Sequence, residues 1–244
     1  NSSADSRFTD FENRFIDAYW KQNPSAAIYA GYGKYYDVLK IPDSAAFAGD
    51  VQFAKMYLDS LHGFEYSSLS SNDKIDYRIL ENQLNSSIWY TDTFKIQEWD
   101  PSAYNIGGEC YEILTKNFAP LAQRLQILSS HIEHADAYYA AALKMIHQPT
   151  LEHADLAVQQ NEGSLDIFGS MLADSIKASS LTGAEKDTLE QRASRTKKAI
   201  TAYVNELKKI LSDKNFSFRS FRVGETLFNA KFKYDIVTDY TAKE

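Results

Sequence analysis

Apolar residues recur at helical spacing along most of this chain. The clearest run lies between Pro120 and His147 and alternates steps of four and three: Leu121, Leu125, Leu128, Ile132, Ala135, Tyr139, Ala142 and Ile146. A second run with the same alternation comprises Leu189, Ala193, Thr196, Ile200, Tyr203, Leu207 and Ile210. Such a narrow apolar stripe is typical of a helix that packs against its neighbours at a shallow angle. The two runs predict two long helices of a bundle.

The same spacing predicts helices over residues 8–22, 44–62 and 70–97. Thr182-Gly183-Ala184-Glu185 is a capping-box pattern that starts the last long helix. No segment shows the sustained alternation of apolar and polar residues that a strand requires. We therefore expect an all-α, bundle-like fold of about seven helices without a significant β-sheet. Residues 1–7 are expected to be a flexible lead-in, and residues 8–244 a single helical domain.

Both ends of the sequence suggest a longer protein. The chain begins at Asn1 without an initiator Met, and its polar opening is typical of a segment that follows a removed leader. Thr241-Ala242-Lys243-Glu244 is a second capping-box pattern, which marks the start of a helix. We therefore expect this chain to be the N-terminal half of a longer protein.

Composition excludes several classes of function. The 26 basic and 33 acidic residues give a net charge of −7, which disfavours a nucleic acid or an anionic membrane as partner. No apolar run reaches the roughly 18 residues that a membrane span requires. Cys110 is the only cysteine, so the chain can form no internal disulfide, Cys-based zinc site or iron–sulfur cluster. A small, buried apolar role is expected for it.

The search for catalytic motifs finds no complete one. A helical zinc peptidase site needs two histidines four residues apart with a glutamate beside the first, written HExxH, and the sequence has no such string. In His131-Ile132-Glu133-His134 the histidines are three residues apart, and the apolar stripe places His131 at its flank and His134 toward solvent. We assign no catalytic, cofactor-binding or metal-binding residue in this chain. The basic residues after Lys186 are interpreted as the solvated face of the last long helix.

Aromatic residues gather in two irregular segments. One contains Tyr35 and Tyr36, and the other contains Trp99, Asp100 and Tyr104. Aromatic loop residues with polar atoms commonly line clefts or interfaces, so these five are the candidate cleft-lining residues. Packing of the loops against the bundle is the competing interpretation.

Several of these segments resemble the bacterial DUF885 family. The resemblance rests on Glu98-Trp99-Asp100-Pro101-Ser102 with Tyr104 and the following Gly-Gly turn, on Asn117-Phe118-Ala119-Pro120, and on Phe221-Arg222-Val223-Gly224-Glu225-Thr226-Leu227-Phe228. The stretch from Phe15 to Asp37 is also similar, so the likeness covers nearly the whole chain. Members of that family are helical proteins of about twice this length. They resemble gluzincin-type zinc metallopeptidases through an HExxH motif in their second half.

The resemblance implies a function for the whole protein rather than for this chain. It implies zinc as the cofactor of the intact protein, a peptide as substrate and the missing C-terminal half as partner. This chain would wall one side of the peptide cleft. Arg222 and Glu225 would lie close to the junction with the missing half, and a structural salt bridge or packing is the competing role for both. Many members carry a secretory or lipoprotein signal, which implies a periplasmic or outer-surface location and an upstream lipid anchor. The alternative is a standalone helical module that binds a peptide or glycan through the aromatic loops.

Overall fold

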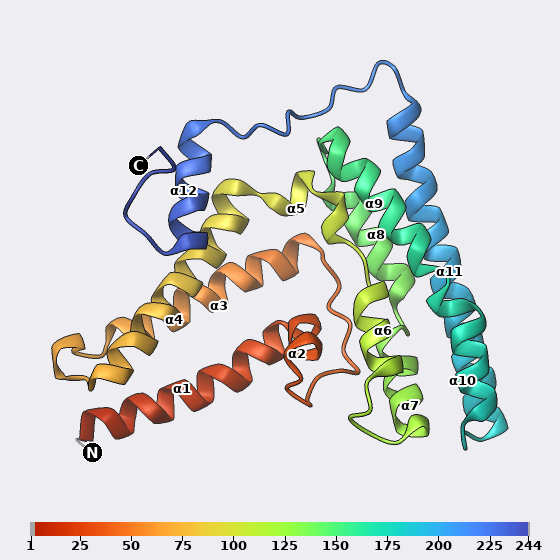
Figure 1. Cartoon of the computed structure of the whole chain (residues 1–244), viewed down its shortest axis with the longest axis horizontal. Coiled ribbons are helices and arrows are strands. Elements are labelled where there is room, and N and C mark those ends of the chain that lie inside the picture. The colour runs from red at the N-terminus through yellow and green to blue at the C-terminus, as the bar shows by residue number, and fades with distance from the viewer. Residues whose placement is uncertain (1–2, 244) are drawn as a thin grey trace. The chain divides into compact units, whose positions relative to one another are not determined.

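Helices account for nearly all regular structure in the computed structural model, which describes residues 3–243 (Figure 1). Residues 3–243 contain no β-strand, and one isolated parallel bridge joins Thr150 to Arg219. The predicted all-α class is therefore confirmed. Helix α1 begins at Ser3, so it extends into the segment expected to be a flexible lead-in. The capping box expected at residues 241–244 includes Glu244, which lies outside the described residues.

The chain divides into two compact units, where the sequence predicts one domain. Unit 1 comprises residues 1–19, 44–96 and 220–244, and unit 2 comprises residues 20–43 and 97–219. Two of the boundaries fall inside helices, α1 (Ser3–Gln22) and α5 (Ile96–Trp99). A Gly-, Pro- or Ser-rich linker marks neither of them, so composition gives no signal of the division.

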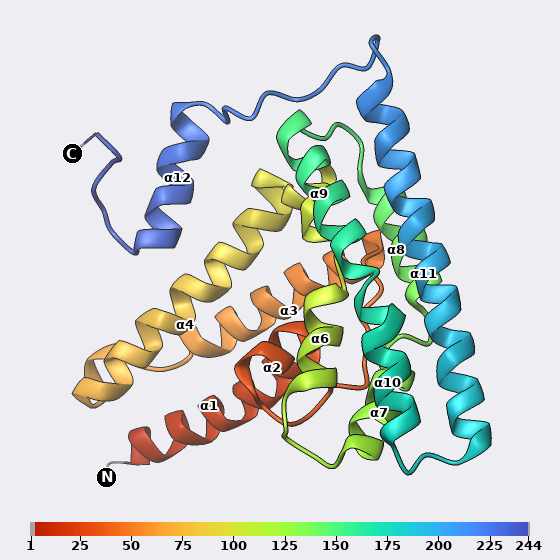
Figure 2. The same ribbon diagram turned by 45° about the vertical axis from the view of Figure 1, so that its right-hand side comes forward.

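Unit 1 is built on an aromatic core. Its elements are most of α1, then α3 (Ser44–His62), η1 (Tyr66–Ser68), α4 (Ser71–Trp89), the π-helical turn η2 (Tyr90–Phe94) and α12 (Glu225–Ile236). Helices α3 and α4 lie side by side in both ribbon views (Figure 2). Phe8, Phe11 and Phe15 are buried at helical spacing on α1, as the sequence predicts. The Phe15 ring meets Tyr57 of α3 edge to face, with centroids 5.1 Å apart.

Unit 2 is a helical bundle whose longest member is α11. Its elements are α2 (Pro24–Ala30), most of α5, η3 (Pro101–Ala103), α6 (Gly107–Thr115), α7 (Leu121–His131), α8 (Ala135–Met145), α9 (Leu151–Ser164), η4 (Ile167–Met171), α10 (Leu172–Ala178) and α11 (Gly183–Ser212). Helices α7, α8 and α9 all pack against α11. Within residues 3–243, no helix combines the length and apolar character that crossing a bilayer demands.

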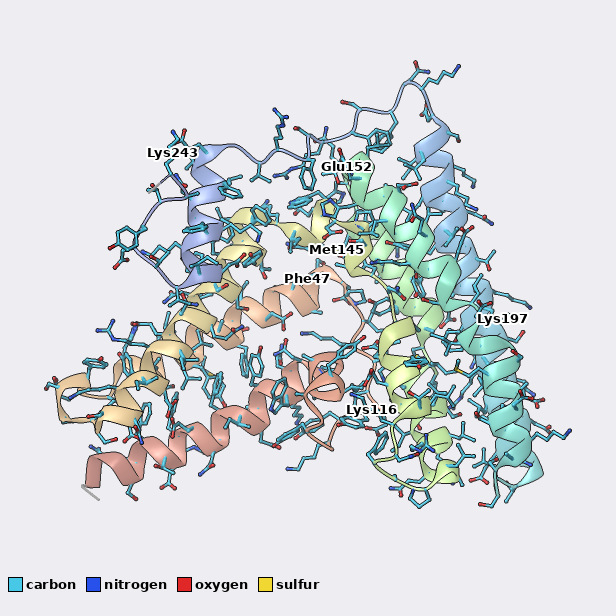
Figure 3. All side chains as sticks on the ribbon, viewed as in Figure 1. Phe47, Lys116, Met145, Glu152, Lys197 and Lys243 are labelled. Atoms are coloured by element: carbon cyan, nitrogen blue, oxygen red, sulfur yellow. The ribbon has the colours of Figure 1, made fainter. Side chains whose placement is uncertain are left out.

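Helix α11 follows the sequence prediction closely. Thr182 and Glu185 form the predicted capping box, in which each side chain accepts the other residue's backbone N–H. The first six residues of the predicted stripe, from Leu189 to Leu207, are buried. Lys197 is exposed on the opposite face and extends away from the helix in Figure 3, which agrees with the solvated basic face that the sequence indicates.

Two predicted helices are each broken by a turn. The helix expected between Pro120 and His147 ends at His131, and two bonds of the i to i+3 type, from Glu133 N–H and Ala135 N–H, close a turn before α8 begins. The helix expected over 70–97 changes to a π-helical turn after Trp89 and stops at Lys95, whose φ is 53°. A left-handed residue cannot continue a right-handed helix. Each break divides one predicted helix into two and so adds to the number of helices that the sequence predicts.

Candidate functional site

The loop after α2 and the start of α7 enclose a surface pocket in unit 2, here called the aromatic pocket. Its lining residues are Gly33, Tyr35, Tyr36, Asp37, Phe118, Ala119, Pro120, Gln123 and Ile127. Two of the five predicted cleft-lining residues, Tyr35 and Tyr36, are among them. The volume of about 340 Å³ lies near the lower end of the range for ligand sites, about 300–1,000 Å³. The aromatic pocket therefore suits one side chain or a small fragment.

Two left-handed residues shape the loop side of the aromatic pocket. Gly31, with φ of 69°, ends α2 by donating its N–H to Ala27 and Ile28 carbonyl oxygens. Tyr35 has φ of 64°, a conformation that costs a non-glycine residue about 1–2 kcal/mol. The Tyr36 hydroxyl accepts the Gly33 N–H at 3.0 Å and draws the loop into a tight turn. Strain of the kind seen at Tyr35 gathers at functional sites, so it makes this loop a candidate for ligand binding.

A buried arginine holds the opposite wall in place. The Arg124 Nε donates to the Ala119 carbonyl at 2.9 Å, and its Nη1 donates to the Leu114 carbonyl. These bonds fix the segment that carries Phe118, which remains 43% exposed at the mouth of the pocket. Since the Arg124 guanidinium is buried and committed to backbone carbonyls, it offers little to a ligand.

Tyr36 and Phe118 join the two walls. Their rings meet edge to face with centroids 5.1 Å apart and planes at 86°. On the loop side the Tyr35 ring stacks on Tyr32, which in turn lies against Trp20. Asp37 is exposed and supplies the only formal charge among the lining residues given above. The pocket thus combines aromatic rings with one carboxylate.

The second predicted segment is part of the interior of unit 2. Trp99, Asp100 and Tyr104 are all buried. The Tyr104 hydroxyl donates to the Gln97 carbonyl at 2.7 Å, and Tyr203 of α11 donates to the Pro101 carbonyl at 2.7 Å. Burial raises the pKa of both tyrosines, with nearby acidic groups and tyrosines adding to the effect, so their hydroxyls stay protonated as donors.

Three residue types of a catalytic triad, Asp100, His153 and Thr150, lie together but have neither its hydrogen-bond geometry nor its access to substrate. The Thr150 Oγ1 lies 2.6 Å from His153 Nδ1, and His153 Nε2 lies 3.8 Å from Asp100 Oδ2. Thr150 is only 1% exposed, and its hydroxyl caps α9 by accepting the His153 N–H. No substrate carbonyl can reach a nucleophile buried in this way. The group instead holds Trp99, whose ring also contacts His153 and the Arg219 guanidinium.

The five predicted residues therefore do not form one site. Tyr35 and Tyr36 line the aromatic pocket, whereas the packing of Trp99, Asp100 and Tyr104 favours the competing structural interpretation. Phe118 and Asp37 complete the pocket and were not predicted as site residues. Phe118 lies far from the loop in the sequence, so only the fold reveals that they meet.

One group of carboxylates in unit 1 has the spacing of metal ligands. Glu12, Asp73 and Asp76 each bring an oxygen within 4.8 Å of the others. Burial, followed by the charges of Asp76 and Asp73, raises the pKa of Glu12 from 4.5 to about 7. Three carboxylates without histidine suit Mg²⁺ or Ca²⁺ rather than catalytic zinc. Because Glu12 is far from Asp73 and Asp76 in the sequence, no local motif reveals this group of carboxylates.

His131 and Cys110 are interior residues. His131 is fully buried, so the predicted position at the flank of the stripe was wrong; its Nε2 lies 3.2 Å from Glu109 Oε1 on α6. The helix ends at His131, and α6 packs over that end. Cys110 is buried as predicted, and burial raises the pKa of its thiol, which disfavours the nucleophilic thiolate.

Comparison with known proteins gives one family and one similar structure. Residues 24–244 match the family described as "Bacterial protein of unknown function (DUF885)". The fold is similar to that of "a putative lipoprotein of unknown function from Shewanella oneidensis", with a TM-score of 0.94 and 41% sequence identity. That match covers 97% of this chain and 43% of the other chain, so this chain spans less than half the length of its structural relative. No curated protein matches the sequence.

Proposed function

Because this chain belongs to the bacterial DUF885 family, we propose that it is the N-terminal helical part of a longer cell-envelope hydrolase of the metallopeptidase type. Its role is to form one wall of the cleft that binds a peptide. The aromatic pocket carries this proposal, since it is lined by the strained Tyr35 and the exposed Phe118 beside the start of α7. The lipoprotein description of the structural relative supports a periplasmic or outer-surface location with an upstream lipid anchor.

The residues of this chain do not fit the zinc that the family resemblance implies. The sequence has no HExxH string, and the Glu12 carboxylate group lacks histidine. We therefore assign no catalytic step to this chain and expect the zinc ligands in the part of the longer protein that this chain does not cover. In this proposal the chain binds and orients the substrate, and the remaining part performs the chemistry.

Exposed apolar residues on unit 1 support the expectation that another part of the longer protein packs there. Ile75 and Ile79 lie one turn apart on α4 and are 58% and 59% exposed. Asn82, one turn further, donates to the Tyr234 carbonyl of α12, whose end carries the exposed Ile236 and Val237. Exposed large apolar residues near one another are typical of an interaction site. We expect the C-terminal part of the longer protein to cover it.

Hydrolysis by the longer protein tests the proposal. The full-length natural protein is assayed with a panel of peptides, with and without a zinc chelator. We expect cleavage that the chelator abolishes and that added Zn²⁺ restores. Activity that resists the chelator, or no cleavage of any peptide, would contradict the metallopeptidase assignment.

The aromatic pocket also favours a second candidate function, that of a binding module without hydrolysis. In that case the chain would bind a peptide or glycan, and the longer protein would leave the bound molecule intact. The assay described above separates the two candidates, because only the first predicts a cleaved product.

A further inference from the structure

We propose that the aromatic pocket binds a cationic side chain with an apolar stem, that of lysine or arginine in a peptide. This inference rests on the proposed function, because it names the class of residue that the substrate cleft selects. Three features of the pocket support it: its charge, its rings and its size.

The charge of the lining favours a cation. Asp37 is the one residue with a formal charge among those that enclose the pocket. Arg124, behind the opposite wall, is buried and donates to the Ala119 and Leu114 carbonyls. Neutral donors such as the Gln123 amide also line the pocket, but an anion there meets a like charge, whereas an ammonium or guanidinium group gains an opposite charge.

The rings favour a cation on an apolar stem. Tyr35, Tyr36 and Phe118 present aromatic surface to the pocket, and aromatic faces attract ammonium and guanidinium groups. Phe118, Ala119 and Ile127 offer apolar contact to the methylene groups that precede the charge. The loop cannot easily rearrange, since Tyr36 is buried and accepts the Gly33 N–H.

The size of the pocket favours a single residue. A volume of about 340 Å³ accommodates one long side chain, and a folded partner or an extended glycan would exceed it. A depression of similar size, about 310 Å³, lies between α7 and the start of α11 and has one carboxylate, Glu185, but no aromatic residue among its lining residues. Glu185 already accepts the Thr182 N–H and the Gln126 amide, so it is less available to a cation than Asp37.

The experiment measures binding of capped tripeptides to the chain by isothermal calorimetry. The probes are acetyl-Gly-X-Gly-amide with lysine, arginine, norleucine or glutamate at X, and Gly-Gly-Gly-amide with an unblocked amino terminus. We expect the lysine and arginine probes to bind about fivefold tighter than norleucine, which corresponds to an exposed cation–π contact aided by one carboxylate. Glutamate and the unblocked triglycine are expected to bind more weakly than norleucine.

Matched variants locate the effect. Asp37→Asn should remove the preference for lysine over norleucine, and Phe118→Ala should weaken both probes. Asp187→Asn and Tyr111→Ala change an exposed acid and an exposed ring outside the pocket and should leave both affinities unchanged. Circular dichroism checks that each variant is folded.

The possible results separate this inference from the proposed function. Equal binding of lysine and norleucine, tighter binding of glutamate or of the unblocked amino terminus, or no binding at all would overturn the inference. Persistence of the lysine preference in Asp37→Asn would also overturn it. Selective lysine binding without peptide cleavage by the longer protein would support this inference while contradicting the hydrolase assignment. Peptide cleavage by the longer protein without selective lysine binding would support the hydrolase assignment and overturn this inference.

Discussion

The Tyr36 and Phe118 rings meet edge to face across the aromatic pocket, with centroids 5.1 Å apart. Tyr36 is buried in a loop that follows α2, and Phe118 is 43% exposed just before α7. This contact joins the loop that contains the strained Tyr35 to the segment before α7. The Arg124 side chain holds that segment through a hydrogen bond to the Ala119 carbonyl. Two segments that lie far apart in the sequence thus enclose one pocket.

Phe118→Ala should remove the contact between the two walls. An aromatic pair contributes about 0.5–1.5 kcal/mol beyond its buried area, so we expect the free energy of unfolding to fall by about 1 kcal/mol. Urea denaturation measures this change. Tyr111→Ala, at a ring that is 45% exposed on α6, is the control for loss of an exposed aromatic side chain. An equal loss of stability in both variants would show that the Tyr36 contact contributes nothing.

Tyr35→Gly should relieve backbone strain, because glycine adopts a φ of 64° without penalty. Tyr111→Gly, in the middle of α6, relieves no strain, and the low helix propensity of glycine lowers the stability of this variant. We expect the first variant to be less destabilised than the second by about 1 kcal/mol. Thermal unfolding followed by circular dichroism provides the comparison. A larger loss at residue 35 would mean that the lost stacking of the Tyr35 ring on Tyr32 outweighs the relief of strain, which contradicts this prediction.

Tyr203→Phe tests whether the segment from Trp99 to Tyr104 is held by interior hydrogen bonds. The variant removes the Tyr203 hydroxyl donor, and the Pro101 carbonyl then accepts only the Tyr104 N–H. Loss of one buried hydrogen bond costs about 0.5–1.5 kcal/mol, measured as a lower midpoint in urea. Tyr111→Phe changes an exposed hydroxyl and should be neutral. Equal midpoints for the two variants would argue against the structural role of this segment.

Glu12→Gln should change how stability depends on pH. The pKa of Glu12 is raised to about 7, mainly by burial, so the folded state binds the proton more tightly than the unfolded chain does. Its stabilising contribution is complete below the ordinary value of 4.5 and is lost as pH rises through about 7. The variant has no proton to lose, so its advantage over the natural chain should grow across this window.

The size of that advantage is limited by solvent. A shift of this size corresponds to about 3 kcal/mol for a fully buried group, and screening of this partly exposed carboxyl reduces it to about 1 kcal/mol. Urea denaturation at pH 4.5, 6 and 8 measures the difference between the two proteins. A difference that stays constant across the three pH values would contradict the raised pKa.

Local patterns predict the helices well and their interruptions poorly. The stripe of α11 and its capping box at Thr182 could be read from the sequence, because both depend on contacts within a few residues. The turn after His131 and the left-handed Lys95 could not, since apolar spacing continues across both breaks. The division into two units likewise has no local signal, because the chain crosses between them inside α1 and α5.

The candidate site could be predicted only in part. The criterion of aromatic residues with polar atoms selects Tyr35 and Tyr36, which line the pocket. It selects Trp99 and Tyr104 as well, which are interior. Composition does not tell a ring at the surface from a ring that donates inward to a carbonyl. The partner wall with Phe118 depends on tertiary packing that no local pattern encodes.

The most direct test of the account measures peptide cleavage by the full-length protein carrying Phe118→Ala or Tyr111→Ala. If this chain walls the substrate cleft, Phe118→Ala should raise KM for a lysine-containing peptide about fivefold and leave kcat nearly unchanged. Tyr111→Ala should have the same KM and kcat as the natural protein. An unchanged KM in Phe118→Ala, or an equal effect of both substitutions, would contradict the account.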